Sequence, residues 1–305
     1  MKHIFQWLRK NIVNIILLTL LFTGIGLILY PSLSNWYNMR LHAHVVMDYN
    51  EEVSTMDQET IDAIWKSAES YNRELAAAGN DWVPGEDKIQ RYLEELRFNE
   101  EGVIGYLSIQ KINLSLPIYH TTGEEVIKKG AGHLAGSSLP VGGKDTHSVL
   151  SSHRGLPTAM LFTNLDKLLV GDSFQLNILN HTLSYQVDQI RIVEPTDFSD
   201  LSIVDGEDYC TLLTCTPYGI NSHRLLVRGH RTATKGNNVA VPSDAMQYEP
   251  VLIAPFFAAP VLFLGLIWLL LTTSGRSRIR RSREKALSQV LSGKGTVVSD
   301  GDAEK

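Results

Sequence analysis

The chain has 305 residues, of which 44% are hydrophobic and 20% are charged, and its formal net charge is −5. This composition excludes a wholly disordered chain, and it also excludes a chain embedded in a membrane along its whole length. Basic residues gather at both ends, so the region between them is acidic, which argues against nucleic acid as its partner.

An uncharged run near the N-terminus, residues 12–30, is long enough to span a membrane. At 1.5 Å per residue it nearly matches a hydrocarbon core of about 30 Å. A cleaved signal peptide is the alternative, but the run is longer than the apolar part of such a peptide, and Tyr30-Pro31 is a poor cleavage site. We therefore expect an uncleaved transmembrane helix, preceded by a basic cytoplasmic N-terminus at residues 1–11.

Residues 31–102 are expected to form a helical region. From Asp57 to Ala78, apolar residues recur at three- and four-residue spacing, which indicates an amphipathic helix, and Gly79 ends it. Packing of this helix on the domain is favoured over binding of a partner. A turn-rich loop follows at residues 80–85, with the sequence NDWVPG, and it carries Trp82.

Between residues 103 and 234 the pattern changes to short runs rich in β-forming residues, several with an apolar residue at every second position. Seven or eight such runs indicate a closed barrel or a sandwich of strands. Short helical connections are expected at residues 124–129 and 163–169. The runs are VIGYLSIQ, INLSLPIYH, HSVLSSH, SFQLNILN, TLSYQVDQIRIVEP, YCTLLTC and HRLLVRGH.

A second uncharged run, residues 250–273, follows a linker at residues 235–249. A buried core helix is the alternative, but the length of the run and the six basic residues from Arg276 to Lys285 favour a second transmembrane helix. Both termini are then cytoplasmic, and residues 31–249 lie outside the cell. Residues 274–305 are first basic and then patternless, so we expect a disordered cytoplasmic tail.

The chain has two cysteines, Cys210 and Cys215, both in the run YCTLLTC. If this run is one strand, the two side chains point to opposite faces and their Cα atoms lie about 16 Å apart, which is too far for a disulfide. Cys210 is then a small buried hydrophobic residue. Cys215 ends the strand at a Pro-Gly turn, and we expect it to be a reactive thiol.

A nucleophilic cysteine needs a group that removes its proton and a group that stabilises an oxyanion. Residues 217–222 connect the strand of Cys215 to the next, so Arg224 is expected beside Cys215 at a strand spacing of about 4.8 Å. Position alone equally allows a surface arginine.

Four of the ten histidines are placed to supply the acid or base: His120, His133, His147 and His153. His153 ends an apolar run immediately before a turn, as Cys215 does, although this pattern ranks it only slightly above His133. The predicted barrel, residues 103–234, has no metal-binding spacing of His or Cys and no GxSxG or phosphate-binding motif, so we expect no metal and no cofactor.

These residues resemble a known family. The stretch TLLTC, ending at Cys215, matches the TLxTC signature of sortases, the membrane-anchored cysteine transpeptidases of Gram-positive bacteria. Arg224 lies where that family carries its active-site arginine, and THSVLSSHRGLP resembles its histidine segment, which maps the catalytic histidine onto His153. The segment GAGHLAGSSLPVGG, the closing HRLLVRGHR and the two spans resemble class C, the pilus-assembling sortases.

The resemblance implies an eight-stranded sortase β-barrel and a two-step reaction. The Cys215 thiolate would attack the Thr-Gly bond of an LPxTG-like sorting signal, and His153 would protonate the leaving amine. A lysine amine of another pilin subunit would then resolve the thioacyl intermediate, while Arg224 steadies the oxyanion. Thr214, Asp81 and Trp82 are further candidates for substrate binding or for a lid.

Class C sortases often carry a lid with an Asp-Pro-aromatic motif before the barrel. This chain has Asp81-Trp82-Val83-Pro84 instead, with the aromatic residue directly after the acid and the proline displaced. An ordinary packed loop is therefore the competing interpretation of residues 80–85.

Two other functions are compatible with the sequence. A housekeeping sortase would attach proteins to an amine of the peptidoglycan cross-bridge, but the second span and the class C-like segments argue against it. A non-enzymatic membrane-tethered β-domain is compatible with the barrel pattern, and only the set of Cys215, His153 and Arg224 argues for an enzyme.

Overall fold

The computed structural model describes residues 2–99 and 102–233, together with isolated residues between 260 and 288. The predicted linker at 235–249 lies outside the described residues, as do nearly all of the predicted second span at 250–273 and of the tail. The chain divides into two compact units, one of residues 1–29 with 248–305 and one of residues 30–247.

The N-terminal span belongs to a long helix, α1 (Lys2–Thr55), which contains Pro31. Among the described residues, α1 is the one helix long and apolar enough to cross a membrane. The sequence pattern does not predict that α1 continues past Pro31 to Thr55. A helix can pass through a proline at the cost of one backbone hydrogen bond, usually with a bend.

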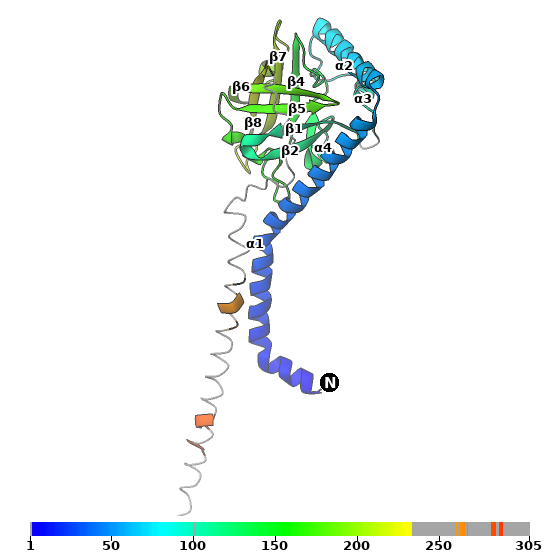
Figure 1. Ribbon diagram of the computed structural model, residues 1–305. Helices are drawn as coiled ribbons and strands as arrows, with labels where there is room; N and C mark the ends of the chain where they lie inside the picture. Colours follow the sequence, from blue (N-terminus) through cyan, green and yellow to red (C-terminus); the bar gives the residue numbers. More distant parts are fainter. Residues whose placement is uncertain are drawn as a thin grey trace, which may run out of the picture. The chain divides into compact units, whose positions relative to one another are not determined.

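Residues 103–232 form a closed barrel of eight strands, which confirms the fold that the sequence predicts (Figure 1). The strand order around the barrel is β1-β2-β3-β4-β7-β8-β6-β5. Seven strands coincide with the seven predicted runs, and β3 is the one that was missed because three residues are too few to show an alternation. The strands are β1 (Val103–Ile109), β2 (Leu114–His120), β3 (Ala131–His133), β4 (Thr146–Ser151), β5 (Ser173–Ile178), β6 (His181–Val193), β7 (Asp208–Thr216) and β8 (His223–Thr232).

Short helices connect the strands. The predicted connections are present as α4 (Glu124–Lys129) and as the 3-10 helix η2 (Leu161–Lys167), and two further single turns are η1 (Gln110–Ile112) and η3 (Ser199–Leu201). Helix α4 lies between β2 and β3, and η2 follows the segment that leaves β4.

Alternation along β7 divides its side chains between two apolar clusters. Cys210 and Leu212 belong to the main core of the barrel, in which both are fully buried. Leu213 packs instead on a second cluster, made of Val149, Val193, Leu201 and Leu226. The second cluster lies on the outer face of β4, β7 and β8, because successive side chains of a strand point to opposite faces.

Helices α2 (Gln58–Ala78) and α3 (Glu86–Glu94) pack on the barrel domain (Figure 1). Asp57 caps α2 by accepting a 2.8 Å hydrogen bond from Thr60 N, and Gly79 ends it, as predicted. The buried Asn72 side chain bonds to both backbone groups of Leu139, so α2 is a packed helix of the domain. Helix α3 was not predicted, and its buried Tyr92 holds it to the barrel.

The second half of α1 also packs on the barrel. The hydroxyl of Tyr49 donates to the carbonyl of Ile104 at 3.2 Å and accepts from Leu179 N at 2.7 Å. Tyr49 is only 2% exposed, so these bonds satisfy a buried polar group and fix the helix to β1 and to the β5–β6 turn.

Candidate active site

Three neighbouring strands bring Cys215, Arg224 and the segment of His153 to one end of the barrel. Strands β7 and β8 are antiparallel, and Cys215 is paired directly with Arg224. Strands β4 and β7 are parallel, with Ser151 opposite Leu213. The pairing continues beyond β4, since Ser152 N donates to Leu213 O at 3.2 Å. The same register, extended by two residues along both chains, directs His153 toward the strand end that carries Cys215.

The two cysteines have opposite environments. Both are free thiols, so the prediction that they form no disulfide is confirmed. Cys210 is fully buried, and burial raises its pKa well above the ordinary value of a thiol. Cys215 is half-buried at the end of β7 and is therefore the thiol that solvent and substrate can reach.

Backbone contacts fix the position of His153. The buried Thr214 hydroxyl donates to the Ser152 carbonyl at 2.8 Å, and Phe162 N donates to the His153 carbonyl at 3.0 Å. Thr214 therefore holds the histidine segment to β7. Thr214 is only 1% exposed, so its hydroxyl is turned away from solvent.

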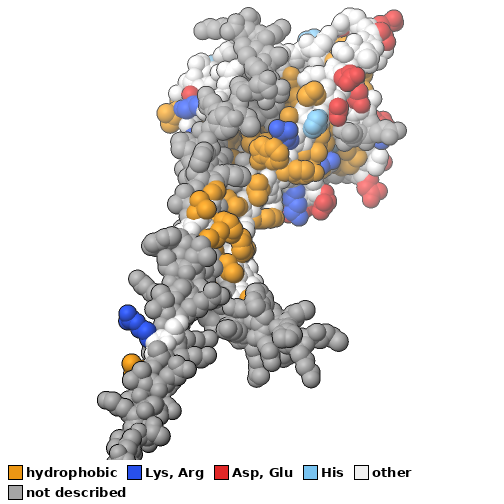
Figure 2. All heavy atoms as spheres, turned by 60° about the horizontal axis from the view of Figure 1, so that its bottom comes forward, with side chains coloured by type: hydrophobic (Ala, Val, Ile, Leu, Met, Phe, Trp, Pro, Cys, Tyr) orange, Lys and Arg blue, Asp and Glu red, His pale blue; other side chains and the backbone are white. Residues whose placement is uncertain are grey.

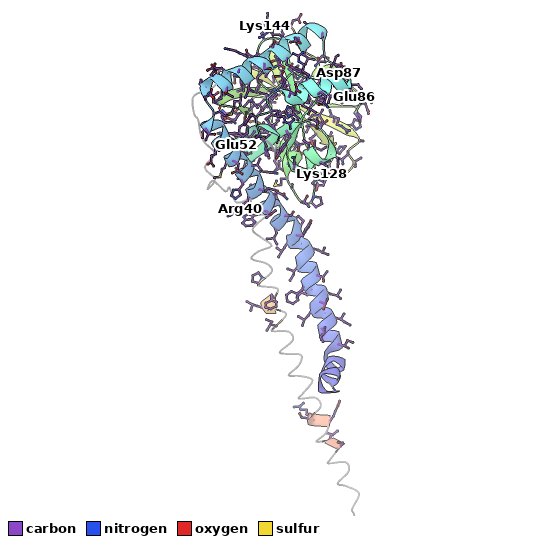
Figure 3. The ribbon with its side chains drawn as sticks, turned by 90° about the vertical axis from the view of Figure 1, so that its right-hand side faces the viewer. Arg40, Glu52, Glu86, Asp87, Lys128 and Lys144 are labelled. Carbon is purple, nitrogen blue, oxygen red and sulfur yellow. The ribbon has the colours of Figure 1, made fainter. Side chains whose placement is uncertain are left out.

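The ring of His153 faces a carboxylate that the sequence did not single out. His153 Nε2 lies 3.5 Å from Glu124 Oε1, and the His153 side chain is 21% exposed. Lys128, one turn along α4, is 3.1 Å from the same oxygen. Lys128, and to a smaller extent His153, lower the pKa of Glu124, so this carboxyl is ionised at neutral pH. In Figure 3, Lys128 marks the end of the barrel at which α4 lies, and Lys144, just before β4, marks the opposite end.

Arg154, in the turn that follows His153, is a second residue that the sequence did not predict for the site. Its guanidinium donates to Thr216 Oγ1 at 3.2 Å and pairs with Asp166, and its side chain is 9% exposed. Arg154, the residue after His153, thus bonds to Thr216, the residue after Cys215, and holds the two segments together.

Arg224 belongs to the wall of a groove beside Cys215. Its NH1 donates to the carbonyls of Asn221 and His223 at 3.3 and 3.2 Å, which orients the guanidinium within the β7–β8 turn. The groove has a volume of about 160 Å³. Its lining is largely apolar and includes Leu134, Val193, Phe198, Leu201, Leu213 and Leu226 together with Arg224.

The loop at residues 79–85 docks next to this groove. Asn80 donates to the Gly136 carbonyl at 3.0 Å and accepts from Ile203 N at 2.9 Å. Trp82 stacks on Phe198, with ring centroids 5.3 Å apart, and packs on the second apolar cluster. Asp81 is 2.6 Å from Lys88. The loop therefore covers the β6–β7 connection, which forms one side of the groove.

His133 and His147, two of the competing histidines, are structural. His133 Nε2 donates to the Ser138 carbonyl at 2.8 Å, and its Nδ1 is 2.9 Å from the Tyr92 hydroxyl. His147 lies 2.7 Å from the Thr211 hydroxyl. Both rings are fully buried, and burial lowers the pKa of each to about 4, so neither takes up a proton at neutral pH.

No metal site is evident in the described part of the chain, since no group of three or more His, Cys, Asp or Glu residues has a geometry suited to an ion.

The Sortase domain family model matches residues 107–232. Sortase C1 from Streptococcus agalactiae is 51% identical, with a TM-score of 0.61, over 62% of this chain and 98% of that structure. Sortase C from Streptococcus pneumoniae is 47% identical, with a TM-score of 0.56, over 62% of this chain and 97% of that structure.

Among curated relatives, Sortase D of Bacillus subtilis (strain 168) is 30% identical over 42% of this chain. The match covers 63% of the length of that relative, slightly less than two thirds. The fold, the strand-end cysteine and these likenesses together show that the chain belongs to the sortase family, and its structural neighbours are class C members.

Proposed function

We propose that the protein is a cysteine transpeptidase in which Cys215 is the nucleophile, His153 the general acid and base, and Arg224 the group that stabilises the oxyanion. The observation that carries this proposal is the strand register, which pairs Cys215 with Arg224 and directs the chain of His153 to the same strand end.

In the first step, the Cys215 thiolate attacks the carbonyl carbon of the Thr-Gly bond in an LPxTG-like sorting signal. The carbonyl oxygen becomes an oxyanion, which the Arg224 guanidinium stabilises. When the tetrahedral intermediate collapses, the C–N bond breaks and the glycine amine takes a proton from His153. A thioacyl group remains on Cys215.

In the second step, the lysine amine of another pilin subunit attacks the thioacyl carbon. The amine loses a proton to His153, the C–S bond breaks, and the Cys215 thiolate is restored as an isopeptide bond forms. The resting protonation of the pair is thereby regenerated, so no cofactor is needed.

The apolar groove supports both substrate choice and the outcome of the second step. Leucine and proline side chains of a sorting signal gain free energy when they leave water for a groove lined by residues such as Leu134, Leu213 and Leu226. A filled apolar groove also limits the access of water to the thioacyl group, so an amine can compete with hydrolysis.

The class C neighbours support pilin subunits as the substrates. One neighbour, 44% identical, is described as sortase C1 of a pilus island, and the Streptococcus pneumoniae structure is described in terms of pilin substrate specificity. Attachment of proteins to a peptidoglycan amine is the competing function, and it differs only in the acceptor.

We further propose that the protein is anchored in the cell membrane with both termini in the cytoplasm and residues 31–249 outside. The apolar part of α1 supports one span. The basic residues that follow residues 250–273 support the second span and the orientation.

An acceptor competition tests the proposed function. The full-length protein in detergent micelles is incubated with a sorting peptide, a pilin domain that offers lysines, and a small amine that mimics the cross-bridge, and products are identified by mass spectrometry. We expect the isopeptide product with pilin lysine to dominate. A dominant cross-bridge product would favour wall anchoring, and recovery of intact peptide alone would exclude both.

A further inference from the structure

Helix α1 presents polar side chains to the barrel where apolar ones would be expected. Asn35, Asn38 and His42 recur at spacings of three and four, so they lie on one face of the helix. Asn35 is 6% exposed and His42 is 8% exposed. Buried polar groups are costly unless they are hydrogen-bonded, so a buried polar face indicates specific partners.

The partners of the two asparagines lie in the segment that begins with His153. Asn35 Oδ1 accepts a 2.9 Å hydrogen bond from Met160 N. Asn38 Nδ2 donates to the Thr158 carbonyl at 2.8 Å and to the carbonyl of Ser34 in α1 at 3.0 Å. Ala159, between the two contacted residues, is 5% exposed.

These contacts are connected to His153 by a short path. Phe162 N donates to the His153 carbonyl, and Gly155 N donates to Thr163 Oγ1 at 3.1 Å. The segment therefore folds back on itself, and residues 158–160 are held within a closed turn that starts at His153. A displacement of Met160 relative to the barrel would move the histidine backbone with it.

The third member of the polar face reaches the other partner of the histidine. The His42 ring hydrogen-bonds to the backbone of Lys129, the last residue of α4. Helix α4 carries Glu124, which faces His153. Figure 3 shows Arg40 of α1 and Lys128 of α4 at the same end of the barrel. In Figure 2, where this end comes forward, hydrophobic side chains gather on it.

We propose that Asn35, Asn38 and His42, the polar face of α1, are positioning residues for His153. The helix that carries the candidate membrane span is then part of the scaffold of the active site as well as an anchor. This inference rests on the proposed function, because it assigns the residues a role in the reaction of Cys215 and His153.

The physical reason is preorganisation. The segment from His153 to η2 is largely irregular, and an untethered segment of this kind samples many backbone conformations. A catalytic histidine must stay within a fraction of an ångström of its productive place, and a misplacement of about 1 Å can cost as much as 100-fold in rate. Hydrogen bonds from a rigid helix restrict the segment before substrate arrives.

The test uses the full-length protein in detergent micelles. In Asn38→Asp the donor to Thr158 O is lost and a carboxylate faces two carbonyls, whereas Asn38→Gln retains an amide donor. We expect Asn38→Asp to lower kcat for the sorting peptide about tenfold with KM within twofold, and Asn38→Gln to restore part of that loss. Asn35→Ala is expected to act in the same direction. Tyr37→Ala, on the exposed face of the same helix, is the control and should match the unsubstituted protein.

Hydrogen exchange of residues 153–163 provides a readout that does not depend on activity. We expect faster exchange in this segment in Asn38→Asp and unchanged exchange in β1 and β2. Unchanged exchange in the segment would overturn the inference, and so would faster exchange with an unaltered kcat. Absence of turnover in the unsubstituted protein would count against the proposed function, while the exchange result would still decide whether α1 holds the segment.

Discussion

Cys210 and Cys215 share one strand, yet their surroundings assign them different chemistry. Cys210 faces the barrel core, where burial raises its pKa and keeps the thiol protonated. Cys215 faces the groove side, opposite Arg224, and is half-buried. At the scale of single residues, reactivity therefore follows from the alternation of side chains along β7.

The cysteine pair provides the first prediction. Iodoacetamide should modify Cys215 in the native protein and leave Cys210 unmodified. The reagent reacts with the thiolate form of a cysteine and must be able to reach the sulfur, which is buried in Cys210. Cys215→Ala should abolish acyl transfer, whereas Cys210→Ala should retain it with a stability loss of about 1–2 kcal/mol. Peptide mapping after labelling checks the first part, and modification of Cys210 at a comparable rate would contradict it.

Glu124 provides the second prediction. Its carboxylate lies 3.5 Å from His153 Nε2 and orients the ring, so Glu124→Gln should lower kcat for the sorting peptide about two- to fivefold, the size typical of an exposed ion pair. Glu125→Gln removes the same charge from the neighbouring position of α4 and serves as the control. An equal loss of kcat in both variants would contradict a specific role of the contact between Glu124 and His153.

The loop at residues 79–85 is the element closest in character to a lid. It lacks the proline arrangement of the family motif, but Asn80 and Trp82 attach it to the β3–β4 and β6–β7 connections. Glycine is required at Gly136, because a Cβ atom there would lie 1.9 Å from the Asp81 carbonyl oxygen. We propose that the loop restricts access to the groove through Trp82, which stacks on the groove residue Phe198.

Replacement of this tryptophan is the third prediction. Trp82→Ala should raise both the alkylation rate of Cys215 and the hydrolysis of a short sorting peptide, by about fivefold, because access to the groove no longer requires breaking the stack on Phe198. Val83→Ala changes an 88% exposed neighbour in the same loop and should alter neither rate. If Trp82→Ala also leaves both rates unchanged, the loop is ordinary packing.

The same elements show what the sequence can and cannot predict. Alternation predicted seven of the eight strands, and a turn between adjacent strands predicted the pairing of Cys215 with Arg224. Glu124 and the polar face of α1 could not be predicted, because their partners lie 29 to more than 100 positions away along the chain. Local patterns predict which residues face a strand end, whereas contacts between distant segments depend on how the barrel closes.

The stability of the folded domain against acid depends on three buried histidines that are neutral at neutral pH. Burial lowers the pKa of His42, His133 and His147 to about 4 in the folded state, below the ordinary value of 6.5. Between these values the unfolded chain binds more protons, so folding stability is full above about pH 6.5 and is lost as the pH falls toward 4. Burial also raises the pKa of Asp208, which favours folding at low pH, but this is one group against three histidines.

The fourth prediction is the size of this loss. Each histidine contributes about 1.4 kcal/mol per pH unit, so the free energy of unfolding should fall by up to about 4 kcal/mol per unit between pH 6 and pH 5. Urea unfolding of the protein in micelles, followed by tryptophan fluorescence, measures it. His44→Ala replaces an exposed histidine of α1 and is the control for a histidine substitution in this helix. A flat profile across this range would contradict the neutral, buried state of the three rings.

The central claim is that Cys215, His153 and Arg224 act together on one acyl group. Its most direct test is to incubate the full-length protein with an LPxTG-like peptide without an amine acceptor, and to locate the acyl adduct by mass spectrometry. We predict a hydroxylamine-sensitive thioester on Cys215, formed at least 100-fold more slowly in His153→Ala and Arg224→Ala. An adduct on another residue, or an adduct on Cys215 that forms at the same rate in both variants, would contradict the account.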